Sequence, residues 1–195
     1  MKTNQLFIST FFCCSLIAFA ACSKDEENPK EDTLLPDKII ENTIYVDGTG
    51  SLAGPVQRYY SLENGSEIAA AMKNDNNWDI AFKRSEIFIN SGTSGGGNVA
   101  AQALDKLYDE VTTAPASGYL KDGEGEKDVD TGRKSPFSNW YNYDLSTLQI
   151  TPKEQTYIIL TNNKKYVKLK IDNYSAGKYN LTYTIQTSGS KNLSE

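Results

Sequence analysis

The sequence predicts a mostly β protein, a single antiparallel β-sheet or sandwich domain with one or two short helices. Apolar and polar residues alternate with a period of two in several short runs, as in strands that bury one face. Turn-forming residues separate these runs, for example at Asn64-Gly65 and Ala176-Gly177. The chain has 195 residues, which is enough for one such domain.

The first 37 residues are expected to export and anchor the protein. Residues 1–21 combine Lys2 with the apolar stretch Leu6–Ala21, which is typical of a signal peptide. Cys22 follows at a position that resembles a lipobox, so we expect it to be lipidated, with residues 22–37 as a disordered tether; an incidental cysteine is the alternative. Ser23–Glu27 resembles a surface-export signal, which indicates a lipid anchor in the outer membrane and exposure on the cell surface. A plain solvated tether is the alternative there.

The composition excludes several kinds of site. The chain contains no histidine, and its three cysteines are Cys13 and Cys14 in the predicted signal peptide and Cys22. The mature chain therefore has no disulfide, no Ser-His-Asp triad and no histidine-ligated zinc. Acidic residues number 25 against 20 basic ones, and this balance does not favour nucleic acid as a partner, because its binding needs concentrated positive charge.

The folded domain is expected to span residues 38–188, with strands at Lys38–Asp47 and Val56–Leu62. Ser66–Asn74 is alanine-rich and begins with a capping serine, which favours a helical turn or two. Val99–Val111 has apolar residues at helical spacing and also favours helix.

The end of the domain is expected to form an antiparallel meander with one dry and one wet face. Its strands are Thr156–Leu160, Lys165–Ile171 and Tyr179–Gln186. Residues 189–195 are expected to be a C-terminal tail.

The stretch Trp78–Gly97 combines an aromatic strand with a glycine-rich loop. Trp78, Ile80 and Phe82 alternate with other residues, which predicts one inward aromatic face. The glycines that follow permit unusual backbone angles and close approach, so the loop is a candidate site. The glycine spacing resembles that of a phosphate-binding loop, but the lysine of that motif is missing. It also resembles a dinucleotide-binding loop, but the alternating strands and helices that surround such a loop are not expected here. A structural bend is therefore the better interpretation.

The segment from Ser117 to Asp144 holds the other candidates. Ser117–Pro136 is a long polar loop, and such loops are usually functional or mobile. Its acidic residues could bind calcium, although a solvated loop is the favoured interpretation. One aromatic set either fills the core or lines a flat slot for a planar ligand such as a porphyrin: Trp78, Phe82, Trp140, Tyr141 and Tyr143.

Several segments together resemble the HmuY family of haem-binding lipoproteins. Trp-Asp-Ile-Ala-Phe at 78–82, followed by Ile-Asn-Ser-Gly-Thr-Ser-Gly at 89–95, is similar to the family signature. Further similar segments follow in order: Val111–Pro115, Trp140–Tyr143, Thr151–Lys153 and Lys165–Leu169. The resemblance implies an all-β fold, extended chain near Val99–Val111, and capture of haem outside the cell for delivery to an outer-membrane transporter.

Known members of that family hold the haem iron with two histidine or methionine side chains. The resemblance places one ligand position at Leu148 and the other in the loop from about Thr113 to Asn139, where this chain has neither residue type. The metal ligands are therefore unassigned. Either a tyrosine (Tyr119, Tyr141 or Tyr143) holds the iron with help from Arg133 or Lys134, or a porphyrin binds by apolar contact alone, or the site has changed to another ligand or a protein partner.

Two functions follow as hypotheses. The first is a surface-exposed, haemophore-like lipoprotein that binds haem or a related porphyrin for uptake, through Tyr119, Trp140, Tyr141, Tyr143 and Leu148. The alternative is a structural or adhesion-type surface lipoprotein that binds protein or glycan. We do not expect an enzyme, because no pair of carboxylates stands out from the solvated surface.

Overall fold

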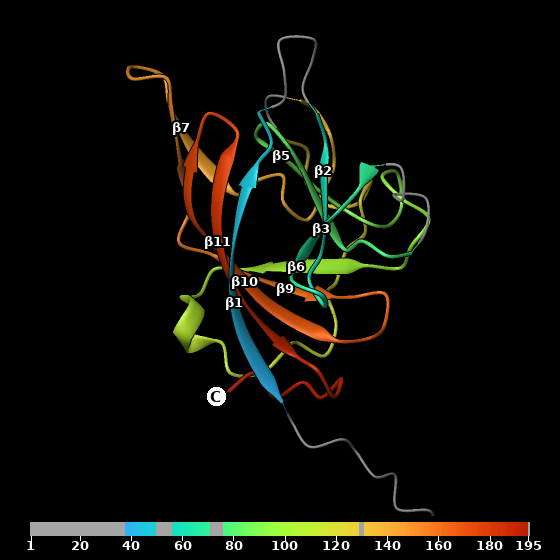
Figure 1. Cartoon of the computed structure of the whole chain (residues 1–195). Coiled ribbons are helices and arrows are strands. Elements are labelled where there is room, and N and C mark those ends of the chain that lie inside the picture. The colour runs from blue at the N-terminus through green and yellow to red at the C-terminus, as the bar shows by residue number, and fades with distance from the viewer. Residues whose placement is uncertain (1–37, 50–55, 71–75, 129–130, 195) are drawn as a thin grey trace, which may run out of the picture. The chain divides into compact units, whose positions relative to one another are not determined.

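The computed structural model describes residues 38–49, 56–70, 76–128 and 131–194, which are mostly β (Figure 1). All strand pairings among them are antiparallel, so the predicted fold class is confirmed. The expected signal peptide, the tether and Cys22 lie outside the described residues. None of the helical segments within the described ranges has the length and apolar character that a membrane crossing requires.

The larger sheet has five strands in the order β1-β11-β10-β9-β6 (Figure 1). The strands are β1 (Ile39–Asp47), β6 (Ala100–Leu104), β9 (Thr156–Leu160), β10 (Tyr166–Ser175) and β11 (Lys178–Gln186). The meander expected at the end of the chain is therefore present. Its last turn uses Ala176 and Gly177, both with positive φ, as a tight hairpin requires.

The smaller sheet has four strands in the order β3-β2-β4-β5. They are β2 (Arg58–Ser61), β3 (Ser66–Ile68), β4 (Ile80–Lys83) and β5 (Glu86–Ile89). Two further strands, β7 (Tyr141–Asp144) and β8 (Gln149–Pro152), pair only with each other and form a separate hairpin.

The main core consists of apolar side chains from the five-stranded and the four-stranded sheets. From β11 it takes the predicted inward set, which is Tyr179, Leu181, Tyr183 and Ile185. From the smaller sheet it takes Tyr60, Ile80, Phe82, Ile87 and Ile89. The rings of Phe82 and Tyr179 meet with their centroids 4.9 Å apart, so the two sheets pack as a sandwich.

The face of the meander that was expected to be wet is partly covered. Lys168 and Thr184 are buried there beneath a 3-10 turn at Tyr108–Glu110. Gln186 is buried beneath the chain that follows β11, where its side-chain amide donates to Asn192 O at 3.2 Å. The chain after β11 also packs on the domain, because Leu193 is fully buried and its N–H donates to Thr112 O at 2.8 Å.

Two helix predictions are wrong. Ser66–Ile68 forms β3, because Gly65 at φ +62° turns the chain back onto β2. Residues 71–74 of the same prediction lie outside the described residues. Ala100–Leu104 forms β6, because it pairs with the edge of β9 and buries Ala101. In both places the available pairing partner outweighs local helix propensity.

The alternation predicted for Trp78–Phe82 holds only from Ile80 onward. Ile80 and Phe82 lie in the main core, whereas Trp78 packs with Tyr59 and Ala81 in a separate cluster. Asp79, which lies between Trp78 and Ile80 in the chain, is buried, and its Oδ2 accepts a hydrogen bond of 2.8 Å from Leu62 N–H. Both faces of this strand are therefore covered, which is the reason that the prediction of one inward face is wrong.

Candidate functional site

The glycine-rich loop is built around the buried side chain of Asn90. The Asn90 amide donates to Trp78 O at 2.9 Å and accepts from Gly97 N–H at 3.0 Å. Its backbone carbonyl accepts from Val99 N–H at 3.2 Å. A single side chain thus closes the loop and joins it to the start of the aromatic strand.

Three of the loop glycines are required by close approach. Gly92 has φ +54°, and a Cβ there would lie 1.8 Å from Asp122 O. A Cβ on Gly95 would lie 2.1 Å from Asn90 Oδ1, and one on Gly97 would lie 2.6 Å from Asn90 O. The signature that resembles the HmuY family is therefore first of all a packing arrangement, as the interpretation of a structural bend predicts.

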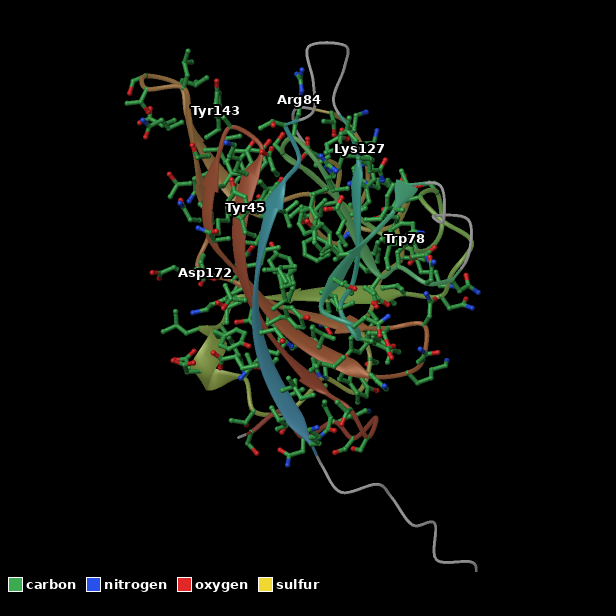
Figure 2. The ribbon with its side chains drawn as sticks, viewed as in Figure 1. Tyr45, Trp78, Arg84, Lys127, Tyr143 and Asp172 are labelled. Carbon is green, nitrogen blue, oxygen red and sulfur yellow. The ribbon has the colours of Figure 1, made fainter. Side chains whose placement is uncertain are left out.

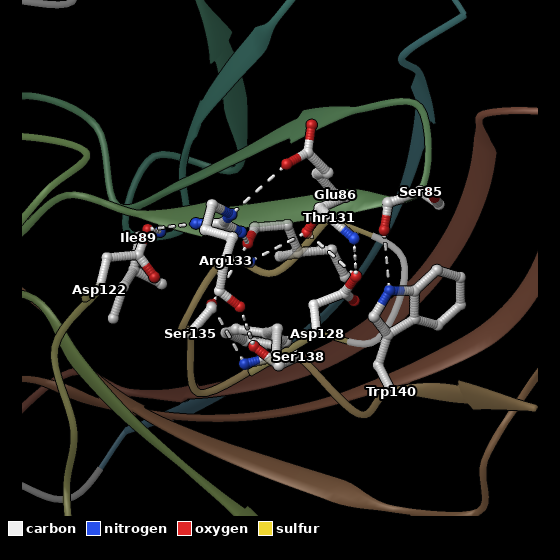
Figure 3. Close-up of polar contacts among 12 residues, drawn as sticks. Ser85, Glu86, Ile89, Asp122, Asp128, Thr131, Arg133, Ser135, Ser138 and Trp140 are labelled. Carbon is white, nitrogen blue, oxygen red and sulfur yellow. Dashed lines mark hydrogen bonds and ion pairs between the residues drawn. The ribbon is translucent and has the colours of Figure 1, made fainter. Parts of the chain in front are cut away.

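The long loop is anchored along β5, whose edge it covers (Figure 3). The Arg133 guanidinium donates to Ile87 O and to Asp122 Oδ2, the latter at 3.0 Å, and lies 3.9 Å above the Phe88 ring. Asp122 Oδ2 also accepts from Ile89 N–H at 3.2 Å. These contacts occupy the polar groups of an edge strand that would otherwise be open to pairing.

A pocket of about 350 Å³ lies beside this loop. Five of its lining residues come from the loop itself: Gly118, Leu120, Glu126, Ser135 and Pro136. Two more, Ser138 and Asn139, follow just after it. The opposite wall includes Gln102 of β6 and Tyr157 of β9. Its volume is in the range of small-molecule sites, and the loop is the one in which the resemblance places an iron ligand.

Trp140 and Tyr141 belong to the core. Trp140 is 1 % exposed, and its indole N–H donates to Ser85 O at 2.9 Å (Figure 3). Tyr141 is buried beside it, with ring centroids 4.8 Å apart. Phe82 also lies in the main core. The core interpretation therefore applies to these members of the aromatic set.

Tyr119 faces away from the pocket. Its neighbours Gly118 and Leu120 line the cavity, whereas its own ring packs near Tyr166 and its hydroxyl donates to Pro115 O at 3.1 Å. Burial raises the pKa of Tyr119 well above its usual value of 10. This shift opposes the tyrosinate form that would bind iron.

Tyr143 lies on the β7–β8 hairpin and is exposed (Figure 2). Leu148 lies on the same hairpin and is also exposed. Tyr143 is 45 % exposed and Leu148 is 70 % exposed. Leu148 has φ +57°, in the turn between the strands. The base of the hairpin adjoins the pocket, because Lys153 N–H donates to Trp140 O at 2.9 Å and its ammonium group donates to Asn139, which lines the cavity.

The predicted site residues are thus divided among three environments. Trp140 and Tyr141 are in the core, Tyr119 is in a second apolar cluster, and Tyr143 and Leu148 are on the hairpin. Arg133, which was considered as a partner for an ionised tyrosine, is bound to Asp122 instead.

The acidic residues that the structure describes do not gather into a metal site. Within the described ranges, no three His, Cys, Asp or Glu side chains are grouped to hold an ion. Asp122 is bound to Arg133, and Asp128 accepts from Thr131 N–H at 2.8 Å, so these two carboxylates serve the loop itself. Asp130 lies outside the described residues.

Sequence analysis missed most residues that line the pocket. Tyr157 was assigned to a strand, and nothing in its period of two distinguishes a pocket wall from core. Its ring stacks on Phe137 with centroids 4.4 Å apart, and its hydroxyl donates to Gln155 at 3.1 Å. The only available signal was the length of the loop from Ser117 to Pro136.

The chain is similar to a known protein family and to several solved structures. The family model described as HmuY protein matches residues 54–186. A search of curated proteins found no match.

Three solved structures share the fold. The apo HmuY analogue of Tannerella forsythia is 17 % identical over 76 % of this chain and 97 % of its own, with a TM-score of 0.56. A HmuY-like haem-binding protein of Bacteroides vulgatus is 16 % identical over 73 % and 90 %, with a TM-score of 0.53. A lipoprotein of Bacteroides fragilis is 15 % identical over 73 % and 89 %, with a TM-score of 0.52.

Proposed function

This chain belongs to the HmuY family, and from that premise we propose that it is a surface lipoprotein that binds haem or a related porphyrin for uptake. It acts as a binding protein and not as an enzyme. Cys22 carries its lipid anchor in the outer membrane, and an outer-membrane haem transporter receives its cargo. The observation that carries the proposal is the apolar surface of the β7–β8 hairpin.

That hairpin gathers several exposed apolar side chains in one short segment. Among the described residues, seven large hydrophobic side chains are exposed, and three of them are Tyr143, Leu145 and Leu148. Leu145 is 80 % exposed. Exposed apolar surface of this kind marks binding sites, and it includes Leu148, the position at which the family resemblance implies an iron ligand.

The porphyrin is held here mainly by apolar contact. Trp140 and Tyr141 are buried in the core, and Tyr119 is both turned away from the pocket and disfavoured as a tyrosinate by its raised pKa. Tyr143 is the one candidate tyrosine with an exposed side chain. The ring would lie against the hairpin, with the pocket at the hairpin base beside it.

Titration of the full-length protein with haemin and with iron-free protoporphyrin tests the proposal. Both ligands should bind with similar affinity, because the iron contributes little. A shifted Soret band and quenching of tryptophan fluorescence measure binding. If neither porphyrin changes either signal, the proposed function is wrong.

Restoring an iron ligand gives a sharper test. Leu148→His should tighten haemin binding at least tenfold relative to protoporphyrin binding, because only haemin has iron for the imidazole to coordinate. Histidine tolerates positive φ better than leucine, so the hairpin should not be disturbed. Leu148→Asn is the matched control, since asparagine also accepts this backbone but cannot coordinate the iron. It should weaken haemin and protoporphyrin binding by the same factor, because both porphyrins lose the same apolar contact.

A further inference from the structure

A second pocket, of about 430 Å³, lies on the outer face of the smaller sheet. Strand register places Tyr59, Ala81 and Phe88 side by side on that face, whereas Tyr60, Ile80 and Phe82 point into the core. Trp78 packs edge-on against Tyr59 with ring centroids 5.0 Å apart. In Figure 2, Trp78 and Tyr143 lie on opposite sides of the domain, so this pocket is distinct from the hairpin.

The glycine-rich loop forms the rim of this pocket, and Gly96 is its informative residue. Gly92, Gly95 and Gly97 are required by contacts within the fold, but a Cβ on Gly96 would meet no atom within 4 Å and its φ is not positive. The fold therefore does not require glycine at 96. A residue without a side chain at this point leaves the pocket open and lets a ligand approach the backbone.

The lining chemistry selects the class of ligand. The half-buried ring of Phe88 supplies aromatic surface, and it packs against the buried rings of Tyr59 and Trp78, which are 6 % and 1 % exposed. Gln57, Thr93 and Ser94 supply amide and hydroxyl groups that donate and accept hydrogen bonds. No Asp, Glu, Lys or Arg is among the described residues that line the pocket. The nearby Arg133 is held by Asp122. A charged ligand would lack a counter-charge here, and burying it would be costly.

We propose that this pocket binds a neutral saccharide unit, independently of any porphyrin. A sugar ring presents C–H faces that pack on aromatic surface, and its rim of hydroxyl groups matches the Gln57, Thr93 and Ser94 side chains. The ligand would be a neutral glycan within reach of the cell surface on which we expect the protein to lie.

The experiment measures binding of defined sugars to the full-length protein. Glucose, N-acetylglucosamine and maltotriose are the neutral probes, and glucuronic acid is the charged control. Ligand-observed NMR and isothermal titration calorimetry report binding. At least one neutral probe should bind with a dissociation constant of millimolar or lower, and at least tenfold more tightly than glucuronic acid.

Gly96→Phe is the decisive variant, because its Cβ meets no atom within 4 Å and its ring adds bulk at the rim of the pocket. It should weaken sugar binding at least tenfold while leaving the melting temperature and haemin binding unchanged. Leu145→Phe, on the exposed hairpin, is the matched control and should leave sugar binding unchanged. The proposal is overturned if no neutral probe binds, if Gly96→Phe binds as well as wild type, or if Gly96→Phe abolishes haemin binding together with sugar binding.

Discussion

The glycine-rich loop and the β7–β8 hairpin differ in how strongly the fold constrains them. In the loop, Asn90 is 1 % exposed. Glycine is required at three positions there, because a Cβ atom would lie too close to neighbouring atoms. On the hairpin, Leu145 and Leu148 contribute little to packing, since they are 80 % and 70 % exposed. Leu148 even occupies a left-handed backbone angle that suits leucine poorly.

This difference separates the residues that identify the family from those available for function. The Trp78–Gly97 signature is recognisable because its side chains and glycines hold the loop against the sheet. The hairpin position implied as a ligand site, Leu148, is only weakly constrained by packing, because 70 % of it is exposed. The Trp78–Gly97 motif therefore stabilises the fold. Residues that bind a ligand are expected instead where packing constrains the side chains least, as on the β7–β8 hairpin.

Removing Arg133 should have the largest effect on stability. Its partner Asp122 has a fully buried side chain, so Arg133→Ala leaves an uncompensated charge and should lower the free energy of unfolding by about 3–5 kcal/mol. Urea denaturation measures this change. The neighbouring exposed cation provides the control, and Lys134→Ala should stay within about 0.5 kcal/mol of wild type. Equal losses in both variants would show that the loop is not anchored through Asp122.

The buried carboxyl of Asp79 should make stability depend on pH. Burial, partly offset by the hydrogen bond from Leu62 N–H, raises the pKa of Asp79 from 3.8 to about 6. Because the folded state then binds the proton more tightly than the unfolded state, this group favours folding below pH ~4, and that contribution is lost as the pH rises to about 6. The difference corresponds to about 3 kcal/mol.

Asp79→Asn isolates this contribution from that of the other carboxylates. The free energy of unfolding of wild type, measured relative to the variant, should fall by about 2–3 kcal/mol between pH 4 and pH 7. A pH-independent difference would mean that Asp79 has an ordinary pKa.

Two adjacent glycines allow a direct test of the constraint on the loop. Gly95→Ala places a methyl group 2.1 Å from Asn90 Oδ1 and 2.8 Å from the Trp78 ring, so it should lower the free energy of unfolding by about 1–3 kcal/mol. Gly96→Ala should change it by less than about 0.5 kcal/mol. Thermal denaturation of the two variants decides the matter, and similar losses in both would contradict a requirement specific to Gly95.

The smallest effect is expected on the hairpin. Leu148→Asn replaces leucine at φ +57° by a residue that accepts this angle, so it should raise the free energy of unfolding by up to about 1 kcal/mol. Chemical denaturation is again the measurement. A loss above 1 kcal/mol would indicate that the exposed Leu148 side chain has a packing partner after all.

Prediction from sequence succeeded where the alternation of apolar and polar residues agrees with the strand pairing in the structure. β9 has the predicted bounds, and the inward set of β11 was identified residue by residue. It failed at Ser66–Ile68 and Ala100–Leu104, where local composition favours helix but an unpaired strand edge lies nearby. It also failed to separate core tyrosines from site tyrosines, because composition does not reveal on which side of the chain Tyr119 or Tyr141 points.

The sequence by itself determined the antiparallel β class, the terminal meander and the absence of histidine, since periodicity and composition are local properties of the chain. Only the tertiary structure decided that Tyr119 turns from the pocket, that Arg133 neutralises Asp122, and that an open space lies beside Gly96. The physical reason is that burial, charge pairing and empty volume arise between segments far apart in the chain, and no local pattern records them.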